Sequence, residues 1–261
     1  MTAIQYYKIN TQNELLKLRN TFAFWLCIIG GSFIPVIYFI YYLVKFESLI
    51  PQDGTNPWDK FLTDQIMSAA SLLIPLFIVL ITSLIIQVEH KANGLKYLFA
   101  QPIPKWSVYF SKLTVVFASI IATYILFFAM MLVVGLTVGA IHSELRLLEC
   151  SPIFDFPIKL LFRSFIASLG IVGIQFWLSF RFKNFIIPLG IGIVLVITGL
   201  IVFQAEEAQY FPYAYNRLSL FALASESDTF QWFPSFSALS LTYFLIFSVS
   251  GYIDISRMNV T

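Results

Sequence analysis

Six long apolar runs limit what this chain can fold into more than any other feature of its sequence. An α-helix needs about 20 consecutive apolar residues to cross the hydrocarbon core of a bilayer. The runs are close to that length or longer, and they cover residues 22–44, 65–87, 113–141, 157–180, 185–203 and 236–253. We therefore predict an all-α integral membrane protein, in which a single domain of residues 1–261 has six transmembrane helices.

The scarcity of charge supports this prediction. Only 11% of the residues are Asp, Glu, Lys or Arg, whereas soluble domains contain about 25%. The chain therefore has too few charged side chains to cover a water-facing surface of its own, and membrane lipid is its expected surrounding. Its net charge of +2 is too small to indicate a nucleic-acid partner.

The distribution of lysine and arginine predicts the orientation of the helices, because short cytoplasmic loops carry an excess of these residues. If the N-terminus is cytoplasmic, the inner segments hold ten Lys and Arg residues and the outer segments hold six. We therefore expect both termini in the cytoplasm. Cys27 in the first apolar run and Cys150 in an outer loop would then lie at different depths, which argues against a disulfide between them.

Residues 1–21, before the first apolar run, have the pattern of an amphipathic helix. Thr11 and Glu14 fit a capping box, in which both side chains satisfy free amides at a helix start. Leu15, Leu18 and Phe22 then recur at helical spacing. We expect an elbow helix along the inner membrane face. The alternative is that this segment is only the frayed beginning of the first span.

Few polar side chains lie within the apolar runs, and each has an ordinary explanation. Lys112, Lys159 and Arg163 lie close to the ends of their runs, so we expect their charged groups to reach the membrane surface. Gln175 is the most polar residue at depth, and we expect it to form a hydrogen bond between helices. No carboxylate lies where a proton or sodium pathway would need one, so the energy for any transport would have to come from elsewhere.

The sequence contains no motif that indicates an enzyme. It lacks the phosphate-binding pattern G-x-x-x-x-G-K-[ST], the zinc motif H-E-x-x-H and the nucleophile motif G-x-S-x-G. His90 and His142 lie in loops, and neither is spaced from a cysteine as a metal ligand would be. We therefore expect no catalytic residue, no metal site and no cofactor bound by this chain.

Small residues predict close helix packing. Gly135 and Gly139 in the third run form a small-x-x-x-small pattern, which lets helix backbones approach each other. Pro35 and Pro75 interrupt the first two runs. Packing within one subunit explains both features, and the alternative is that kinked spans flex during a transport cycle.

The last outer loop, residues 204–235, is densely aromatic between Tyr210 and Tyr215. Aromatic rings with polar tips favour the headgroup level of a membrane. We therefore expect this loop to lie on the outer leaflet, partly as short helices.

The polar and basic segment between the second and third runs differs from the rest of the chain. Gly94 permits a sharp reversal of the backbone, and Pro102 would end a helix because it lacks an amide donor. Three apolar residues between them recur at helical spacing and form a stripe: Leu95, Leu98 and Phe99. Such a stripe suits the docking of a soluble partner.

The same segment resembles a known family. Seven residues form the pattern E-x4-G-x3-L-x3-P-x2-K-x6-K-L: Glu89, Gly94, Leu98, Pro102, Lys105, Lys112 and Leu113. The pattern is similar to the signature between the second and third spans of ABC type-2 permeases, and it is most similar to the branch that contains bacitracin- and lantibiotic-resistance transporters. This chain departs from the family at Pro104, where a polar residue is common.

The resemblance implies a membrane subunit that works with a separate ATPase. Such permeases act as dimers of identical or related subunits, and each docks an ABC ATPase that binds ATP and Mg²⁺. A coupling helix after the second span fits a cleft in the ATPase. The docking residues implied here are Glu89, Lys91, Gly94, Leu95, Lys96, Leu98, Phe99, Pro102 and Lys105. The lysines would pair with acidic groups of the ATPase or, alternatively, touch anionic lipid and fix the orientation.

The resemblance also implies a substrate path at the dimer interface, lined by the first, second and fifth spans. Its apolar lining would include Leu76, Phe77, Leu80, Ile191 and Val194. That lining favours an amphipathic or hydrophobic cargo, such as a peptide antibiotic, exported across the bacterial cytoplasmic (inner) membrane. An alternative is a non-transporting scaffold or sensor whose aromatic outer loop binds a ligand. An intramembrane enzyme is disfavoured, because no catalytic group lies at depth.

Overall fold

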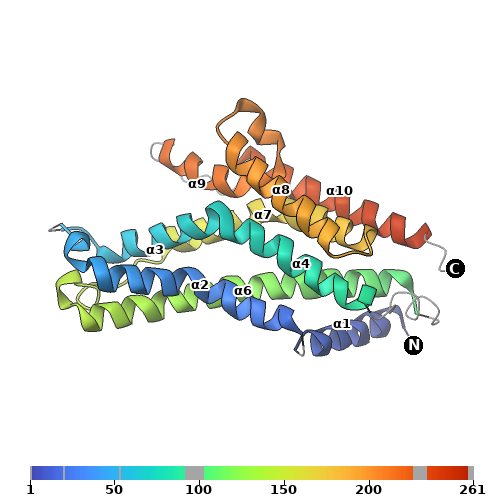
Figure 1. Ribbon diagram of the computed structural model, residues 1–261, viewed down its shortest axis with the longest axis horizontal. Coiled ribbons are helices and arrows are strands. Elements are labelled where there is room, and N and C mark those ends of the chain that lie inside the picture. Colours follow the sequence, from blue (N-terminus) through green and yellow to red (C-terminus); the bar gives the residue numbers. More distant parts are fainter. Residues whose placement is uncertain (1, 20, 53, 92–102, 226–233, 258–261) are drawn as a thin grey trace.

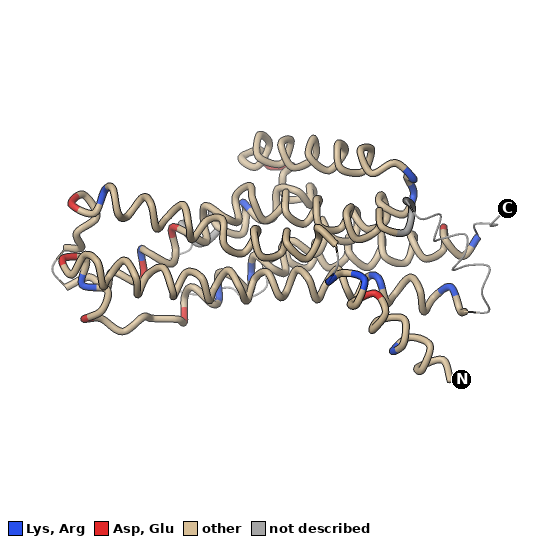
Figure 2. The backbone as a smooth tube through the Cα atoms, turned by 60° about the horizontal axis from the view of Figure 1, so that its bottom comes forward, with Lys and Arg blue, Asp and Glu red and all other residues tan. Residues whose placement is uncertain are grey.

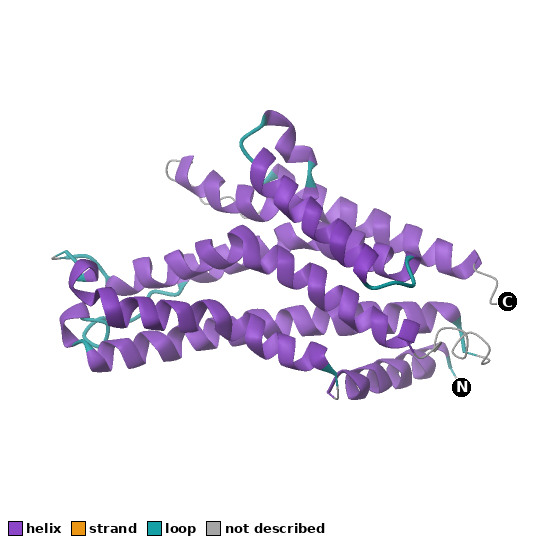
Figure 3. Ribbon diagram, viewed as in Figure 1, coloured by secondary structure: helices purple, strands orange, loops and turns teal. Residues whose placement is uncertain are grey.

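Long helices that run side by side make up the computed structural model of this chain (Figure 1). The structure describes residues 2–19, 21–52, 54–91, 103–225 and 234–257. Within those ranges, every regular element is a helix (Figure 3). The charged residues gather toward the two ends of the long helices, with few between them (Figure 2). This distribution suits a bundle whose middle lies in hydrocarbon.

Among the described residues, five helices are long and apolar enough to cross a membrane. They are α2 (Phe22–Lys45), the continuous helix of α3 (Pro57–Ser68), η2 (Ala69–Leu73) and α4 (Ile74–Lys91), then α6 (Lys105–Ile141), α7 (Asp155–Arg181) and α10 (Ser235–Arg257). The fifth predicted run forms α8 (Ile186–Val202), whose 17 residues stand at the lower limit of about 17–25 for a spanning helix. The fold is that of a multi-pass membrane protein, and the crossing by α8 stays a prediction.

Shorter elements precede or connect these helices. They are α1 (Ala3–Arg19), η1 (Phe46–Leu49), η3 (Ser143–Leu145), η4 (Glu206–Tyr210), η5 (Pro212–Ala214) and α9 (Tyr215–Ser225). The first turn of α1 and the last turn of α10 lie at the same end of the bundle (Figure 1). At this end α4 also ends and α6 begins.

The second membrane helix begins at Pro57, earlier than the predicted residue 65. The side chain of Asn56 accepts a hydrogen bond of 3.0 Å from the amide of Trp58, and proline suits the first helical position because its missing amide hydrogen would have no partner there. Further along, the π-helical segment η2 widens the helix just before Pro75. The wider turn lets the helix continue past a residue that has no amide to donate.

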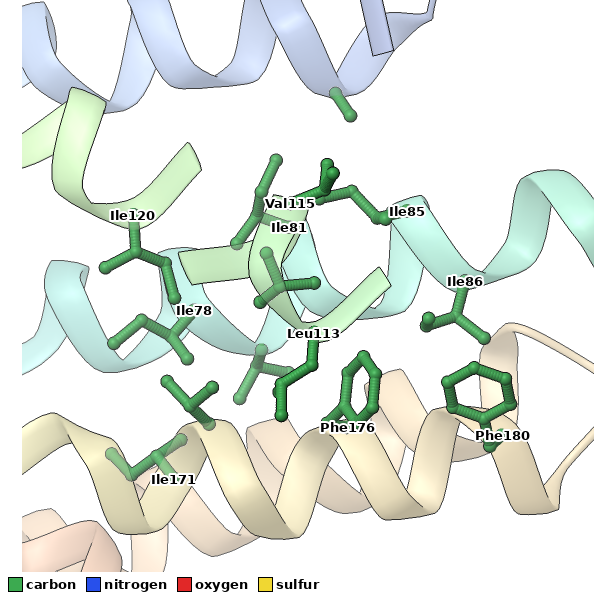
Figure 4. Close-up of a cluster of buried hydrophobic side chains, with 14 of the residues drawn as sticks. Ile78, Ile81, Ile85, Ile86, Leu113, Val115, Ile120, Ile171, Phe176 and Phe180 are labelled. Atoms are coloured by element: carbon green, nitrogen blue, oxygen red, sulfur yellow. The ribbon is translucent and has the colours of Figure 1, made fainter. Parts of the chain in front are cut away.

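Buried aliphatic and aromatic side chains fill the space between α4, α6 and α7 (Figure 4). Representative members are Ile78, Ile81, Ile85, Val115, Ile120, Ile171 and Phe176. On another side of α7, the backbone of α10 comes very close. A Cβ atom added to Gly173 would lie only 2.8 Å from the Cα atom of Phe244. The amide of Gly170 also donates a hydrogen bond of 2.9 Å to the Ser240 hydroxyl, so small residues allow α7 and α10 to pack closely.

Side chains of the same subunit pack directly against Gly135 and Gly139 on α6. A Cβ atom at Gly135 would lie 2.5 Å from the ring of Trp58, and one at Gly139 would lie 2.9 Å from the Cβ atom of Leu147. The indole nitrogen of Trp58 donates hydrogen bonds to the carbonyl oxygens of Leu147 at 2.8 Å and of Cys150 at 3.1 Å. In the described residues these glycines therefore lie against a tryptophan of α3 and a loop, not against another helix backbone.

The predicted N-terminal helix is present as α1, but its predicted cap is wrong. The helix begins at Ala3, where Thr2 and Gln5 form the capping box: the Thr2 amide donates to Gln5 Oε1 at 2.8 Å and the Gln5 amide to Thr2 Oγ1 at 3.4 Å. Thr11 lies within the helix and donates its hydroxyl to the carbonyl of Tyr7 at 2.9 Å. A threonine inside a helix can satisfy its hydroxyl in this way, so the Thr-x-x-Glu pattern did not mark a helix start.

The loop after α8, which we expect on the outer side, forms short helices as predicted, but two tyrosines of its aromatic segment are buried while Tyr210 is 62% exposed. Tyr213 and Tyr215 are buried, with 4% and 0% of their surfaces exposed. Gly199 of α8 makes room for this fold, since an added Cβ atom would lie 2.6 Å from the carbonyl oxygen of Tyr213. The expectation of a surface position is therefore wrong for these two tyrosines, and the hydroxyl of Tyr213 instead donates a hydrogen bond of 3.5 Å to Gln175 Oε1 inside the bundle.

Candidate functional site

The connection from α4 to α6 is the segment to which the sequence assigns partner docking. Glu89 and Lys91 lie at the end of α4, and Lys105 is the first residue of α6. The other docking residues lie outside the part of the chain that the structure describes: Gly94, Leu95, Lys96, Leu98, Phe99 and Pro102. The described start of α6 still shows how one end of this connection is held in the bundle.

Lys105 links the start of α6 to the end of α10. Its ammonium group donates a hydrogen bond of 3.0 Å to the carbonyl oxygen of Ser256, which lies in the last turn of α10. A cation at a helix C-terminus is favourable because the carbonyl groups there are partly negative. At least one donor of Lys105 therefore binds within the subunit.

Three side-chain contacts join α1 to the first turns of α6, and we call them the α1–α6 clasp. Tyr7 shares a hydrogen bond of 2.6 Å with Thr114, and Asn10 donates one of 2.9 Å to the Ser107 hydroxyl. The third contact is an ion pair of 2.6 Å between Lys112 Nζ and Glu14 Oε2. The clasp fixes the elbow helix to the polypeptide that emerges from the α4–α6 connection.

The ion pair of the clasp is buried. The Lys112 residue has 0% of its surface exposed and Glu14 has 8%. The second carboxylate oxygen, Glu14 Oε1, accepts a hydrogen bond of 2.9 Å from Lys17 on the same helix. Both oxygens of Glu14 are therefore compensated by cations, which a buried carboxylate requires.

The expectation that Lys112 and Arg163 reach the membrane surface is wrong. Lys112 is covered by α1. The ion pair with Glu14, and not hydration by water, therefore compensates the charge of its ammonium group. Arg163 has 1% of its surface exposed, and its guanidinium lies 5.2 Å from the ring centroid of Phe236. The expectation considers each helix against lipid alone, whereas neighbouring elements cover both side chains. Lys159 fits the expectation better, because it pairs with the exposed Asp155 near the start of α7.

Gln175 forms the predicted hydrogen bond between helices, and it links three elements at once. Its Nε2 donates to the Ser83 hydroxyl of α4 at 3.0 Å and to the carbonyl of Pro188 on α8 at 2.8 Å. Its Oε1 accepts a hydrogen bond of 3.5 Å from the Tyr213 hydroxyl. The side chain is fully buried, so its polar atoms need these partners.

An aromatic cluster connects the start of α6 with α7 and α10. The ring of Tyr109 packs against Phe176 and Phe180, with centroids 5.1 Å and 5.4 Å apart. Its hydroxyl donates a hydrogen bond of 2.9 Å to the carbonyl of Ser248 on α10. With the clasp and Lys105, this cluster makes α1, α6, α7 and α10 one connected set at the end of the bundle where α4 and α6 are joined.

The five residues assigned to a substrate path fall into two groups in this subunit. Leu76, Phe77 and Leu80 line a pocket between α2, α4 and α6. Ile191 and Val194 lie on α8, which packs against α4 through Gly192: a Cβ atom there would lie 2.4 Å from Val79. Val194 points outward and is 61% exposed. One subunit alone does not bring the two groups together, and the path stays a prediction.

The Glu14–Lys112 pair was not identified from the sequence, although a signal existed. Glu14 is the first acidic residue of the chain, and none follows it until Glu47. An isolated carboxylate beside an apolar run needs a cation, and Lys112 precedes the third run directly. The two residues are 98 positions apart, so only the fold could join them.

The fold defines a multi-pass helical membrane protein in which α1 and α10 hold the start of α6, directly after the α4–α6 connection. A family model described as "ABC-2 family transporter protein" matches residues 11–199. The chain therefore belongs to the ABC-2 transporter family. No curated protein gave a match.

Membership of this family makes the chain a permease subunit of an ABC transporter. Permeases of this family are membrane subunits that are generally not catalytic, and they associate with an ABC ATPase subunit. The matched residues include the Glu14–Lys112 pair of the clasp, the α4–α6 connection and α8 up to residue 199.

Proposed function

We propose that this chain is the permease subunit of an ATP-driven exporter and that its α4–α6 connection docks the ATPase. The observation that supports this role best is the way the α6 flank of the connection is fastened to other helices. Lys105 binds the end of α10, and the clasp binds α1 to α6 within three turns of Lys105. A movement of the connection would therefore be transmitted to α1, α6 and α10, and not only to the loop itself.

The remaining parts of the proposal follow from the family. The subunit pairs with a second permease subunit, identical or related, and ATP and Mg²⁺ bind to the ATPase. Both termini face the cytoplasm of a bacterial cell, and α8 crosses the membrane as the fifth of six spans. The cargo is amphipathic or hydrophobic, such as a peptide antibiotic, as in the bacitracin- and lantibiotic-resistance branch. The apolar linings of the two path segments support such a cargo.

The described part of the loop after α8 gives little support to the alternative function, a sensor whose aromatic outer loop binds a ligand. Its ligand would have to contact aromatic side chains, yet Tyr213 and Tyr215 are buried against the bundle. These rings hold the loop in place, which leaves them few faces for a ligand.

Docking is tested by affinity purification of the tagged chain with its ATPase. Changing Leu98 and Phe99 to Ala should remove apolar contacts that each contribute up to about 2 kcal/mol, so recovery of the ATPase should fall by more than about ten-fold. Lys91→Glu and Lys96→Glu should weaken the association further by charge reversal. Lys105 is left intact, because its change would also disturb α10.

The control is Lys183→Glu, which makes the same charge change at an exposed lysine between α7 and α8, outside the α4–α6 connection. Unchanged recovery of the ATPase with the Leu98→Ala and Phe99→Ala variant would contradict docking through this segment.

The orientation gives a second prediction. Cys150 lies half-buried in the loop after η3, whereas Cys27 lies in α2. A membrane-impermeant maleimide should label the protein in intact cells, and Cys150→Ser should abolish that labelling while Cys27→Ser should not. Labelling that needs lysis of the cells would place both termini outside and reject the proposed orientation.

A further inference from the structure

A cavity of about 700 Å³ lies at the end of the bundle opposite the α4–α6 connection (Figure 1). Its walls come from the loop between α2 and α3, from the first turn of α3 and from the loop that contains η3. Binding sites for small molecules have volumes of about 300–1,000 Å³, so this cavity has room for one. It shares no residue with the predicted substrate path or with the clasp.

Hydrogen bonds between the two loops hold the walls of the cavity in place. The side-chain amide of Asn56 donates to the carbonyl oxygen of Ser151 at 2.9 Å. The indole nitrogen of Trp58, in the first turn of α3, donates to the carbonyl oxygen of Leu147 at 2.8 Å. The cavity therefore keeps its shape without a ligand, and such preorganisation lowers the entropy that binding costs.

The cavity offers apolar surface to a ligand. Leu145 and Leu147 line it and are almost fully buried, with 1% and 2% of their surfaces exposed. Ile50 also lines it and is 48% exposed, although it lies in a loop that the sequence places outside the membrane. A ligand whose apolar part covers Ile50 removes that surface from water, which favours binding.

Tyr42 adds a hydrogen-bonding group to the buried part of the cavity. It lines the cavity, and only 6% of its surface is exposed. Its ring packs edge to face on Phe61, with centroids 5.0 Å apart. Within the part of the chain that the structure describes, its hydroxyl has no hydrogen-bond partner. Buried hydroxyl groups are normally paired, so this one is available to a polar group of a ligand.

Two opposite charges stand at the rim of the cavity. Asp59 and Lys60 line it from the first turn of α3, and both are exposed. Neither forms an ion pair with another residue that the structure describes. A ligand with a single charge would be attracted to one of them and repelled by the other. A ligand with an ammonium group and an anionic group can satisfy both.

We propose that this cavity binds a zwitterionic amphiphile. Its ammonium group lies at Asp59, its carboxylate or phosphate lies at Lys60, and its apolar part covers Ile50. Free peptides and the headgroups of phospholipids such as phosphatidylethanolamine share this chemistry. The site does not depend on ATPase docking or transport, because it lies within one subunit and at the other end of the bundle.

The test measures binding to the full chain in an uncharged detergent by isothermal titration calorimetry. Leucyl-leucine carries both charges, N-acetyl-leucyl-leucine lacks the ammonium group and leucyl-leucinamide lacks the carboxylate. Dihexanoylphosphatidylethanolamine and its N-acetyl derivative form a second series. In at least one series the zwitterion should bind several-fold more tightly than its singly charged analogues, and the series in which it does so identifies a peptide or a lipid as the source. Equal binding within both series, or no binding of either zwitterion, would overturn the proposal.

Variants at the rim test where the zwitterion binds. Asp59→Asn should abolish the preference for the zwitterion over its N-acetyl analogue, because the ammonium group then has no carboxylate to meet. Lys60→Gln should weaken binding of the zwitterion several-fold, and Tyr42→Phe should also weaken it while keeping the ring. The matched controls are Glu144→Gln and Lys45→Gln, which remove exposed charges beside the cavity but outside its lining. Equal effects of the rim and control variants would overturn the proposal.

Discussion

Changing Lys112 to Ala should destabilise the protein by about 3–5 kcal/mol, because it leaves the carboxylate of Glu14 buried without its main cation. The ammonium group of Lys112 is fully buried and lies 2.6 Å from Glu14 Oε2. Lys17 remains on the other oxygen, but its side chain is 41% exposed, so water screens its charge. The loss is measured as a fall in the thermal unfolding midpoint of the full chain in detergent.

Two further variants distinguish the effect of breaking a buried ion pair from the effect of removing an exposed charge. Lys17→Ala should cost less than about 1 kcal/mol, as exposed ion pairs do. The double variant Glu14→Leu with Lys112→Met removes both charges and should recover most of the stability, since apolar pairs often replace buried ion pairs without loss. If Lys112→Ala and Lys17→Ala had equal effects, the clasp would not depend on a buried charge.

Changing Gly173 to Ala should separate α7 from α10. The new Cβ atom would lie 2.8 Å from the Cα atom and 3.1 Å from the carbonyl oxygen of Phe244. These are backbone atoms, so no rotation of a side chain can relieve the contact and one helix must move. Overpacking of this kind costs about 1–3 kcal/mol, and the unfolding midpoint should fall accordingly.

Gly190→Ala is the matched control, because nothing lies within 4 Å of its added Cβ atom on α8. It should be neutral or slightly stabilising, since alanine favours a helix over glycine. The added variant Phe244→Ala should not rescue Gly173→Ala, because it leaves the backbone in place. Full rescue would show that the side chain, and not the helix backbone, limits the approach.

The apolar runs predicted most of the fold because the length of a spanning helix depends only on local sequence. The boundaries were less predictable. Helix α3 starts at Pro57, where the side chain of Asn56 caps it. The turns between Pro57 and the predicted start at residue 65 are too polar to belong to an apolar run. Likewise α6 starts at Lys105, since a helix that leaves the hydrocarbon can continue through Ser107, Ser111 and Lys112 when another helix covers them.

The candidate site was predictable only in part. Hydropathy and loop charge identified the connection after the second span, and Gln175 was correctly assigned a hydrogen bond between helices. The partners of Lys112 and Arg163 come from distant parts of the chain, so reasoning about one helix against lipid placed both at the surface. Two Thr-x-x-[Glu/Gln] patterns also occur near the N-terminus, and only the fold shows that the one at Thr2 caps the helix.

The central claim is that this subunit moves its cargo with energy supplied by another polypeptide. The most direct measurement compares ATP hydrolysis by the purified chain alone with hydrolysis by the chain and its ATPase reconstituted together in vesicles. We expect no hydrolysis by the chain alone, and hydrolysis in the complex that falls when Leu98 and Phe99 are changed to Ala. Hydrolysis of ATP by the isolated chain would contradict the account.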